Sequence, residues 1–191
     1  MARQPVHLSI PERVPAGTEA DGDGIVIGGG PATVDLYIDF ICPFCRQFEE
    51  ASASVLAAIV AANAASLVYH PLGFLDRLST TGYSSRAAAA SGCASDGNKF
   101  IEYKDVLFRN QPEEGGAGLS DAELAELGLA LGLDPGLERC IGEGRYLEWV
   151  AYVTARATER GVSGTPTAFV DGVPVPADGR TIAAAVKGHT P

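Results

Sequence analysis

The stretch Thr33-Val-Asp-Leu-Tyr-Ile-Asp-Phe-Ile-Cys-Pro-Phe-Cys45 decides the fold. Apolar and polar residues alternate from Thr33 to Phe40, which is typical of a strand with one face in the core. From Pro43 to Asn63 apolar residues recur at helical spacing, and they are Phe44, Phe48, Val55, Leu56, Ile59 and Val60. A second strand is predicted at 66–70, ending before Pro71. A strand, a helix and a strand at this spacing predict a βαβ unit with parallel strands and a right-handed crossover.

Helical patterns dominate the middle of the chain, and strand patterns flank them. Helices are predicted at 84–92, 99–109, 120–131 and 147–160, with a short helical turn at 135–141. Ser120 and Glu123 form a capping-box signature at the start of one of them.

Strands are predicted at 24–27 and in a hairpin at 167–173, whose Asp171-Gly172 pair fits a type I′ turn. A last helix is predicted at 180–186. We therefore predict an α/β unit made of residues 24–72 and 161–187. Residues 73–160 form a helical insertion, and residues 1–23 form an extended arm without a core of its own.

Composition narrows the class of protein. The chain has 191 residues, 46% hydrophobic and 20% charged, with a net charge of −10 and no Lys/Arg stripe, so we expect no nucleic-acid partner. The longest apolar stretch, 55–62, is too short to cross a bilayer. Residues 1–18 lack the apolar region of a signal peptide. The protein is therefore either cytoplasmic or has an export signal or anchor that this sequence lacks.

The pair Cys42 and Cys45 carries the candidate chemistry. Pro43 is favoured at the first position of a helix, which makes Cys42 the N-cap with its sulfur facing the N–H groups of Phe44 and Cys45. These donors lower the pKa of a thiol. We therefore expect Cys42 to be a partly exposed nucleophile and Cys45, one turn on, to be a buried resolving thiol.

Two other interpretations of this pair stay open, a structural disulfide and half of a zinc site. Zinc needs a second pair of ligands, and Cys93 and Cys140 stand alone without a nearby cysteine or histidine partner. We expect no metal and no cofactor. We also expect the three histidines, His7, His70 and His189, to be structural.

The cysteine motif and a distant proline together resemble a known family. By itself Thr165-Pro166 before a strand could be an ordinary strand start. Combined with Cys42-Pro-Phe-Cys45, however, Gly164-Thr165-Pro166 resembles the thioredoxin superfamily. The inserted helices and the segment 100–112 are similar to its DsbA-like branch. The resemblance implies a thioredoxin-like fold with an inserted helical subdomain. It also implies that Pro166 is cis beside the cysteines and that the Thr165 backbone pairs with an extended substrate.

The sequence departs from that family at two positions. Phe44 stands where DsbA-like oxidants often carry His, and Leu36 stands where a thioredoxin-like fold usually has an acid. Asp39 is the nearest substitute for moving a proton to Cys45, or else it is an acid that caps a turn. Glu49 and Glu50 are expected on solvated helix faces.

Cys93 and Cys140 are the remaining cysteines, and they are either a disulfide or two buried thiols. Resemblance to actinobacterial DsbA-like proteins favours the disulfide. A permanent disulfide implies an oxidising compartment, so we expect an extracytoplasmic protein.

The resemblance implies a protein disulfide oxidoreductase that donates the Cys42–Cys45 disulfide to exported proteins with cysteine pairs. It implies reoxidation by a quinone-linked membrane protein of the DsbB or vitamin-K-epoxide-reductase (VKOR) type. Because the arm is too short for a dimerisation domain, a monomer is expected. The alternatives are a disulfide reductase or isomerase with the same fold, or a non-catalytic module that binds extended peptides.

Overall fold

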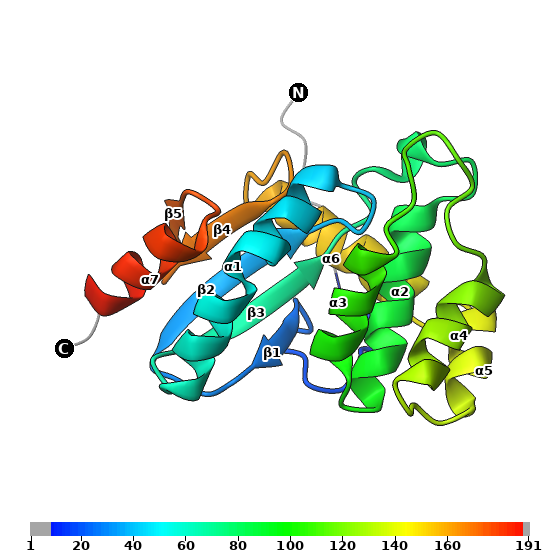
Figure 1. Ribbon diagram of the computed structural model, residues 1–191, viewed down its shortest axis with the longest axis horizontal. Helices are drawn as coiled ribbons and strands as arrows, with labels where there is room; N and C mark the ends of the chain where they lie inside the picture. The colour runs from blue at the N-terminus through cyan, green and yellow to red at the C-terminus, as the bar shows by residue number, and fades with distance from the viewer. Residues whose placement is uncertain (1–8, 189–191) are drawn as a thin grey trace.

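A five-stranded sheet forms the centre of the computed structural model, which describes residues 9–188 (Figure 1). The strand order is β1-β3-β2-β4-β5, and β2 and β3 are parallel while the other neighbours are antiparallel. The strands are β1 (Ile25–Ile27), β2 (Ala32–Ile38), β3 (Ala65–Pro71), β4 (Thr167–Val170) and β5 (Val173–Val175). The parallel pairing predicted for the βαβ unit is therefore confirmed.

Helices cover the sheet and extend it to one side. They are α1 (Pro43–Ala61), α2 (Tyr83–Asp96), α3 (Phe100–Arg109), α4 (Asp121–Ala130), α5 (Gly136–Gly142), α6 (Leu147–Glu159) and α7 (Gly179–Gly188), with a 3-10 turn at Asp76–Leu78. In Figure 1, α1 and α7 lie side by side in front of the sheet, and α6 packs against β3 behind it. Helices α2 to α5 form a block beside the β1 edge. This block meets the sheet at the end of β2, where α1 begins.

The βαβ unit differs from the sequence prediction at its boundaries. Strand β2 ends at Ile38, two residues early, because Cys42 N–H donates to the Asp39 carbonyl (3.1 Å) and closes a turn. Helix α1 ends at Ala61 because Asn63 takes a left-handed conformation (φ 51°) that stops a helix. Strand β3 includes Pro71, which pairs with Ile38 at the end of the ladder, where a missing N–H is tolerated.

Glycines explain two further features. The sequence predicts that the helix of Cys93 ends at Gly92, yet α2 continues to Asp96. A Cβ at Gly92 would lie 2.8 Å from Pro15 and 3.0 Å from Tyr146, so this glycine allows close packing rather than ending the helix. The type I′ turn is confirmed, since Asp171 (φ 48°) and Gly172 (φ 76°) are both left-handed. The capping box of Ser120 and Glu123 is also present.

Residues 9–23, the described part of the predicted arm, lie against α2 and α6. Trp149 Nε1 donates to the Gly22 carbonyl (2.8 Å), and the Tyr152 hydroxyl donates to the Asp21 carbonyl (2.8 Å). The Ser95 hydroxyl donates to the Ala16 carbonyl (2.6 Å). The segment also bridges to β1 through Thr18 and Ile25, so it is held by the helices and the sheet edge rather than by a core of its own.

His70 is buried where this segment meets the sheet. Its ring lies between two carboxylates, with Nδ1 3.4 Å from Asp23 and Nε2 2.9 Å from Asp35, and it stacks on Tyr37. These contacts link the N-terminal segment to β2, which is a structural role for His70. His7 and His189 lie outside the described residues.

Glu49 contradicts the expectation of a solvated helix face. Its side chain is buried, and its carboxylate accepts a hydrogen bond from the Lys104 ammonium of α3 (2.6 Å), which is buried as well. Lys104 also donates to Asp105 (2.7 Å). The prediction failed because α3 lies over this side of α1 and supplies a cation from 55 positions away. Glu50 is exposed, as expected.

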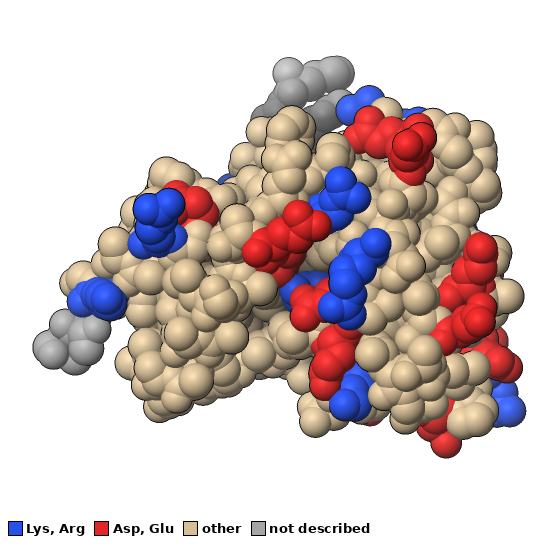
Figure 2. All heavy atoms as spheres, viewed as in Figure 1, with Lys and Arg blue, Asp and Glu red and all other residues tan. Residues whose placement is uncertain are grey.

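Charged side chains are spread over the surface rather than gathered by sign into a basic stripe. On the face in Figure 2, Lys and Arg side chains lie among acidic ones, and the surface over the C-terminal part of α1 is largely uncharged. None of the helices within residues 9–188 is both long and apolar enough to span a bilayer.

Candidate active site

The two cysteines lie at the junction of β2 and α1. A turn over 39–42 follows β2, and α1 begins at Pro43, so Cys42 is the N-cap residue as predicted, although its Sγ makes no capping hydrogen bond to the first turn of α1. Cys45 lies one turn further along α1, and the Asp39 N–H points at its Sγ (3.5 Å). Both cysteines are free thiols in this structure. The strand and the helix thus fix the sulfurs on the same side of the helix start.

Cys42 is less accessible than the sequence suggested. Only 3% of it is exposed, against 0% for Cys45, so the prediction of partial exposure is wrong. The cause is the loop before β4: the Thr165 carbonyl lies over Cys42 and accepts a hydrogen bond from its Sγ (3.3 Å). Phe44, which the helical pattern assigned to the apolar face, is instead 65% exposed.

The loop that covers Cys42 contains the proline singled out in the sequence. The Thr165–Pro166 peptide bond is cis. Thr165 comes from 123 positions along the chain, and its carbonyl is the only oxygen in the described residues that accepts a hydrogen bond from Cys42 Sγ. The structure therefore brings Cys42, Cys45, Thr165 and Pro166 together.

The surroundings separate the acidities of the two thiols. The Cys45 thiol, then the side chain of Thr165 and the N–H groups of Cys45 and Phe44, lower the pKa of Cys42 to about 6, although burial opposes this. Burial first, and then the Cys42 sulfur, raise the pKa of Cys45 far above its ordinary value. One sulfur is thus a thiolate at neutral pH, while the other keeps its proton.

This separation predicts the alkylation behaviour of the reduced protein. Because the pKa of Cys42 is lowered, its thiolate persists as the pH falls toward 6. The alkylation rate of Cys42 should therefore reach half of its maximum near pH 6. Cys45 should remain unlabelled across the same range. Iodoacetamide labelling at a series of pH values, with the labelled cysteine identified by mass spectrometry, checks this result. Equal labelling of both cysteines, or a midpoint near the ordinary value of about 8.5, would contradict it.

Asp39 lies fully buried beneath the cysteines. Its carboxylate accepts hydrogen bonds from Ile41 N–H (3.1 Å), Leu75 N–H (3.0 Å) and the Ser84 hydroxyl (2.7 Å). These contacts cap the turn and tie it to the helical block. Burial raises the pKa of Asp39 to about 6, above its ordinary value and close to that of Cys42. The carboxyl group can therefore exchange a proton near neutral pH.

Sequence reasoning missed Gln111, which also reaches the turn. Its side-chain amide donates to the backbone carbonyls of Phe40 (3.0 Å) and Cys42 (2.9 Å). The residue lies two positions after the end of α3, and no spacing rule connects it to a motif 69 positions earlier. The one sequence signal for Gln111 was its position inside the segment 100–112, which is similar to the DsbA-like branch.

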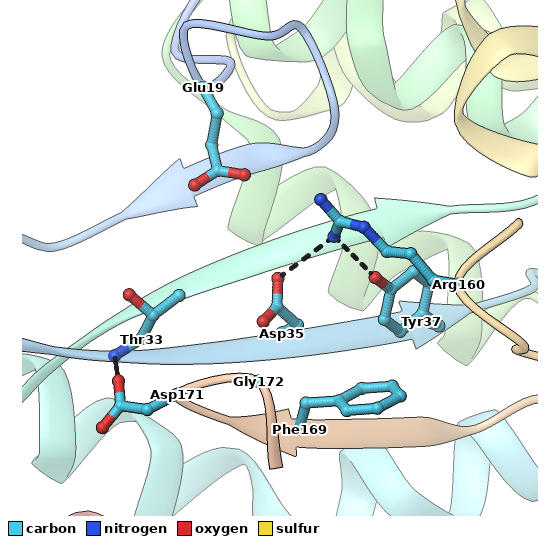
Figure 3. A pocket seen from close by; sticks show the side chains of 8 residues that line it. All are labelled: Glu19, Thr33, Asp35, Tyr37, Arg160, Phe169, Asp171 and Gly172. Carbon is cyan, nitrogen blue, oxygen red and sulfur yellow. Dashed lines mark hydrogen bonds and ion pairs between the residues drawn. The ribbon is translucent and has the colours of Figure 1, made fainter. Parts of the chain in front are cut away.

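Away from the cysteines, a cavity of about 500 Å³ lies against β2 and β4, with Glu19 in its wall (Figure 3). Its polar wall includes Glu19, Asp35 and Arg160, and Figure 3 shows Arg160 directed toward Asp35 and the Tyr37 hydroxyl. It contains none of the predicted site residues. Within residues 9–188, no group of His, Cys, Asp and Glu side chains is arranged to hold a metal ion.

The other two cysteines are joined away from this site. Cys93 in α2 and Cys140 in α5 form a disulfide whose Cα atoms are 6.0 Å apart. It links two helices of the block that are 47 positions apart in the sequence.

Comparison with known proteins identifies close relatives. The model of the family described as Thioredoxin matches residues 21–187. The disulfide bond oxidoreductase DsbG of Mycobacterium tuberculosis is 32% identical, with a TM-score of 0.72 over 81% of both chains. The oxidised form of DsbA from the same organism is 31% identical, with a TM-score of 0.71 over 80% of this chain and 85% of DsbA.

A curated relative is much longer. The serine/threonine-protein kinase PknE of M. tuberculosis is 35% identical over 157 residues, which is 75% of this chain but 28% of PknE. The chain thus spans little more than a quarter of that protein, and the similarity concerns one part of it.

Proposed function

This chain belongs to the thioredoxin family, in its DsbA-like branch of the actinobacterial type, and on that premise we propose that it oxidises cysteine pairs in exported proteins. The fold is thioredoxin-like with an inserted block of helices. The chain is a thiol–disulfide oxidoreductase, and the proposal concerns the direction of exchange, the clients and the residues that act.

The proposal is supported by the placement of the two sulfurs, with Cys42 at the N-cap of α1 against the Thr165 carbonyl and Cys45 buried one turn further on. The pKa of Cys42 is lowered to about 6 by the Cys45 thiol, the Thr165 side chain and helix N–H groups, whereas the pKa of Cys45 is raised. A stabilised Cys42 thiolate favours the reduced state of the pair. The corresponding disulfide is therefore easily reduced, which is the property of an oxidant.

The proposed reaction has two exchange steps. A client thiolate attacks Cys42 Sγ of the oxidised pair, and Cys45 Sγ leaves and takes up a proton. The second client thiolate then attacks the client sulfur of the mixed disulfide and releases Cys42 as a thiolate. The client loses two electrons and gains a disulfide, while the Cys42–Cys45 pair gains the two electrons.

Substrate binding is proposed for the loop that covers Cys42. Thr165 and Pro166 lie against the attacked sulfur, and an extended client segment that pairs with the Thr165 backbone would replace the hydrogen bond from Cys42 Sγ. Backbone pairing tolerates different client side chains. Pro43 and Phe44 form the dipeptide between the sulfurs, and the exposed Phe44 ring offers clients an apolar contact.

Asp39 is proposed to exchange the proton of Cys45. Asp39→Asn should leave the attack of Cys42 on oxidised glutathione unchanged. It should slow the following attack of Cys45 on the mixed disulfide by about 10²-fold, since that step needs a proton acceptor. Quenched-flow alkylation followed by mass spectrometry separates the two steps. Ser84→Ala is the matched control, because it removes one hydrogen bond to the same carboxylate but keeps the acceptor. If the rate of the second step is unchanged in Asp39→Asn, Asp39 takes no part in proton transfer and only caps the turn.

The cellular setting follows from the second cysteine pair. A disulfide between Cys93 and Cys140 persists in an oxidising compartment, which supports an extracytoplasmic location. There we propose that a quinone-linked membrane protein of the DsbB or VKOR type reoxidises Cys42–Cys45. We propose a monomer.

The direction of exchange is tested by two assays on the same preparation. Oxidised protein mixed with a reduced two-cysteine peptide should give one peptide disulfide for each Cys42–Cys45 pair reduced. In the presence of a thiol reductant, it should reduce insulin poorly. Efficient insulin reduction without peptide oxidation would identify a reductase instead, and peptide binding without exchange would identify a binding module.

A further inference from the structure

Gln111 joins the helical block to the segment that presents Cys42. The residue lies two positions after the end of α3, and its side chain is half-buried. Its Nε2 donates to the Phe40 carbonyl (3.0 Å) and to the Cys42 carbonyl (2.9 Å), which lie 71 and 69 positions earlier. A single side-chain amide from outside the βαβ unit thereby hydrogen-bonds to the turn at two points, the carbonyls of Phe40 and Cys42.

The donors and acceptors match in number. A primary amide nitrogen carries two hydrogens, and each points to one carbonyl. Phe40 is fully buried, and its carbonyl accepts no other hydrogen bond from residues 9–188. A buried carbonyl without a donor is costly, so removal of the amide would favour rotation of this peptide group.

The Cys42 carbonyl has a different set of partners. It also accepts from the N–H groups of Cys45 (3.1 Å) and Arg46 (3.3 Å) in the first turn of α1. Gln111, from the loop after α3, adds a third donor. It is the one side chain within residues 9–188 that hydrogen-bonds to the Cys42 backbone. The orientation of the Cys42 peptide is thus set jointly by α1 and by Gln111.

We propose that Gln111 is a positioning residue for thiol–disulfide exchange, which holds the turn so that Cys42 Sγ stays opposite Thr165 and the first N–H groups of α1. This inference rests on the proposed function of Cys42. Hydrogen bonds to sulfur weaken as distance and angle change, so a looser turn reduces the stabilisation of the thiolate. Asp39 anchors the other end of the turn through Leu75 and Ser84, which leaves Gln111 to hold the end next to the sulfur.

The test compares Gln111→Met with Asn110→Met. Methionine keeps the length of the Gln111 side chain but has no donor, and Asn110 is a matched neighbour whose amide donates only to the Val106 carbonyl in α3. The readout is the pH midpoint of Cys42 alkylation. We expect Gln111→Met to raise this midpoint by about one pH unit or more, which is a tenfold loss of thiolate at pH values below the midpoint. Asn110→Met should have the midpoint of the wild type.

Further variants keep the test decisive if Gln111→Met does not fold. Gln111→Glu should raise the midpoint further, because its charge adds to the loss of the donor, whereas uncharged Gln111→Leu should raise it as much as Gln111→Met. Folding is monitored by circular dichroism. An unchanged midpoint in folded Gln111→Met or Gln111→Glu, with only a lower thermal midpoint, would overturn the inference and leave Gln111 a structural role.

The alkylation readout needs no client, so it separates this inference from the proposed function. A wild type that fails to oxidise peptides, with a raised midpoint in Gln111→Met, would contradict the function and support the positioning role. A wild type that oxidises peptides, with the same midpoint in every variant, would support the function and contradict the positioning role.

Discussion

Replacing Cys42 by alanine is expected to lower the rate of dithiol oxidation on the order of 10³-fold or more. The reason is that Cys42 is the nucleophile of the pair, and its Sγ lies 3.3 Å from the Thr165 carbonyl in the loop proposed to bind clients. Cys45 is fully buried, its pKa is raised, and it has no route to a client thiol. Removal of a nucleophile typically costs factors of this size. The rate is measured with a fluorescent two-cysteine peptide.

Cys45→Ala provides the matched comparison. This variant keeps the Cys42 sulfur and should form a stable mixed disulfide with the peptide on Cys42 alone, which mass spectrometry detects. Oxidation by Cys42→Ala at a rate close to the wild type would contradict the assigned roles. Equal peptide affinity in all variants, without any mixed disulfide, would favour the binding module.

Removal of the Cys93–Cys140 disulfide is expected to lower the free energy of unfolding by about 4 kcal/mol. The bridge closes a loop of 47 positions, and in the chain-entropy model a loop of this size contributes about 4 kcal/mol by restricting the unfolded chain. Both cysteines are buried between α2 and α5, where alanine leaves no unpaired polar group. Urea unfolding of Cys93→Ala/Cys140→Ala, with Cys42 and Cys45 kept reduced, measures the effect.

The control is Cys42→Ala/Cys45→Ala, which leaves the structural bridge intact and should unfold within about 1 kcal/mol of the reduced wild type. Mild reductant should open Cys42–Cys45 before Cys93–Cys140, because the Cys42 thiolate is stabilised by nearby donors. Equal unfolding midpoints with and without Cys93–Cys140, or simultaneous reduction of both pairs, would contradict the structural role. The argument for an oxidising compartment would then lose its main support.

Local rules predicted the parts of the fold that depend on neighbouring residues. Pro43 marked the start of α1 and made Cys42 the N-cap, and Asp171-Gly172 marked the hairpin turn. In each case the residue type restricts its own backbone or that of the next residue. Alternating and helical patterns likewise placed β2 and α1 to within two residues.

Long-range contacts account for what the sequence did not predict. The Thr165 carbonyl buries Cys42 from 123 positions away, and Lys104 pairs with Glu49 from 55 positions away. Gln111 reaches Cys42 across 69 positions. No periodicity relates these residues, because their proximity arises only when the helical block and the loop before β4 fold against the βαβ unit. The surroundings of the Cys42 thiol are therefore a product of tertiary packing, with Gln111 supplied by the helical insertion and Thr165 by the loop before β4.

The direct test of the central claim is the equilibrium potential of Cys42–Cys45, measured in glutathione buffers across a range of pH. With a Cys42 pKa near 6, the reduced state gains about 1.4 kcal/mol at pH 7, equivalent to about 30 mV for a two-electron couple. We predict a potential at least about 30 mV above the −270 mV of thioredoxin, that is, about −240 mV or higher. It should change by about 30 mV per pH unit above pH 6, since only Cys45 then takes up a proton, and by about 59 mV below. A potential near −270 mV, the value of thioredoxin, with about 59 mV per pH unit up to pH 8, would contradict an oxidant built on a stabilised Cys42 thiolate.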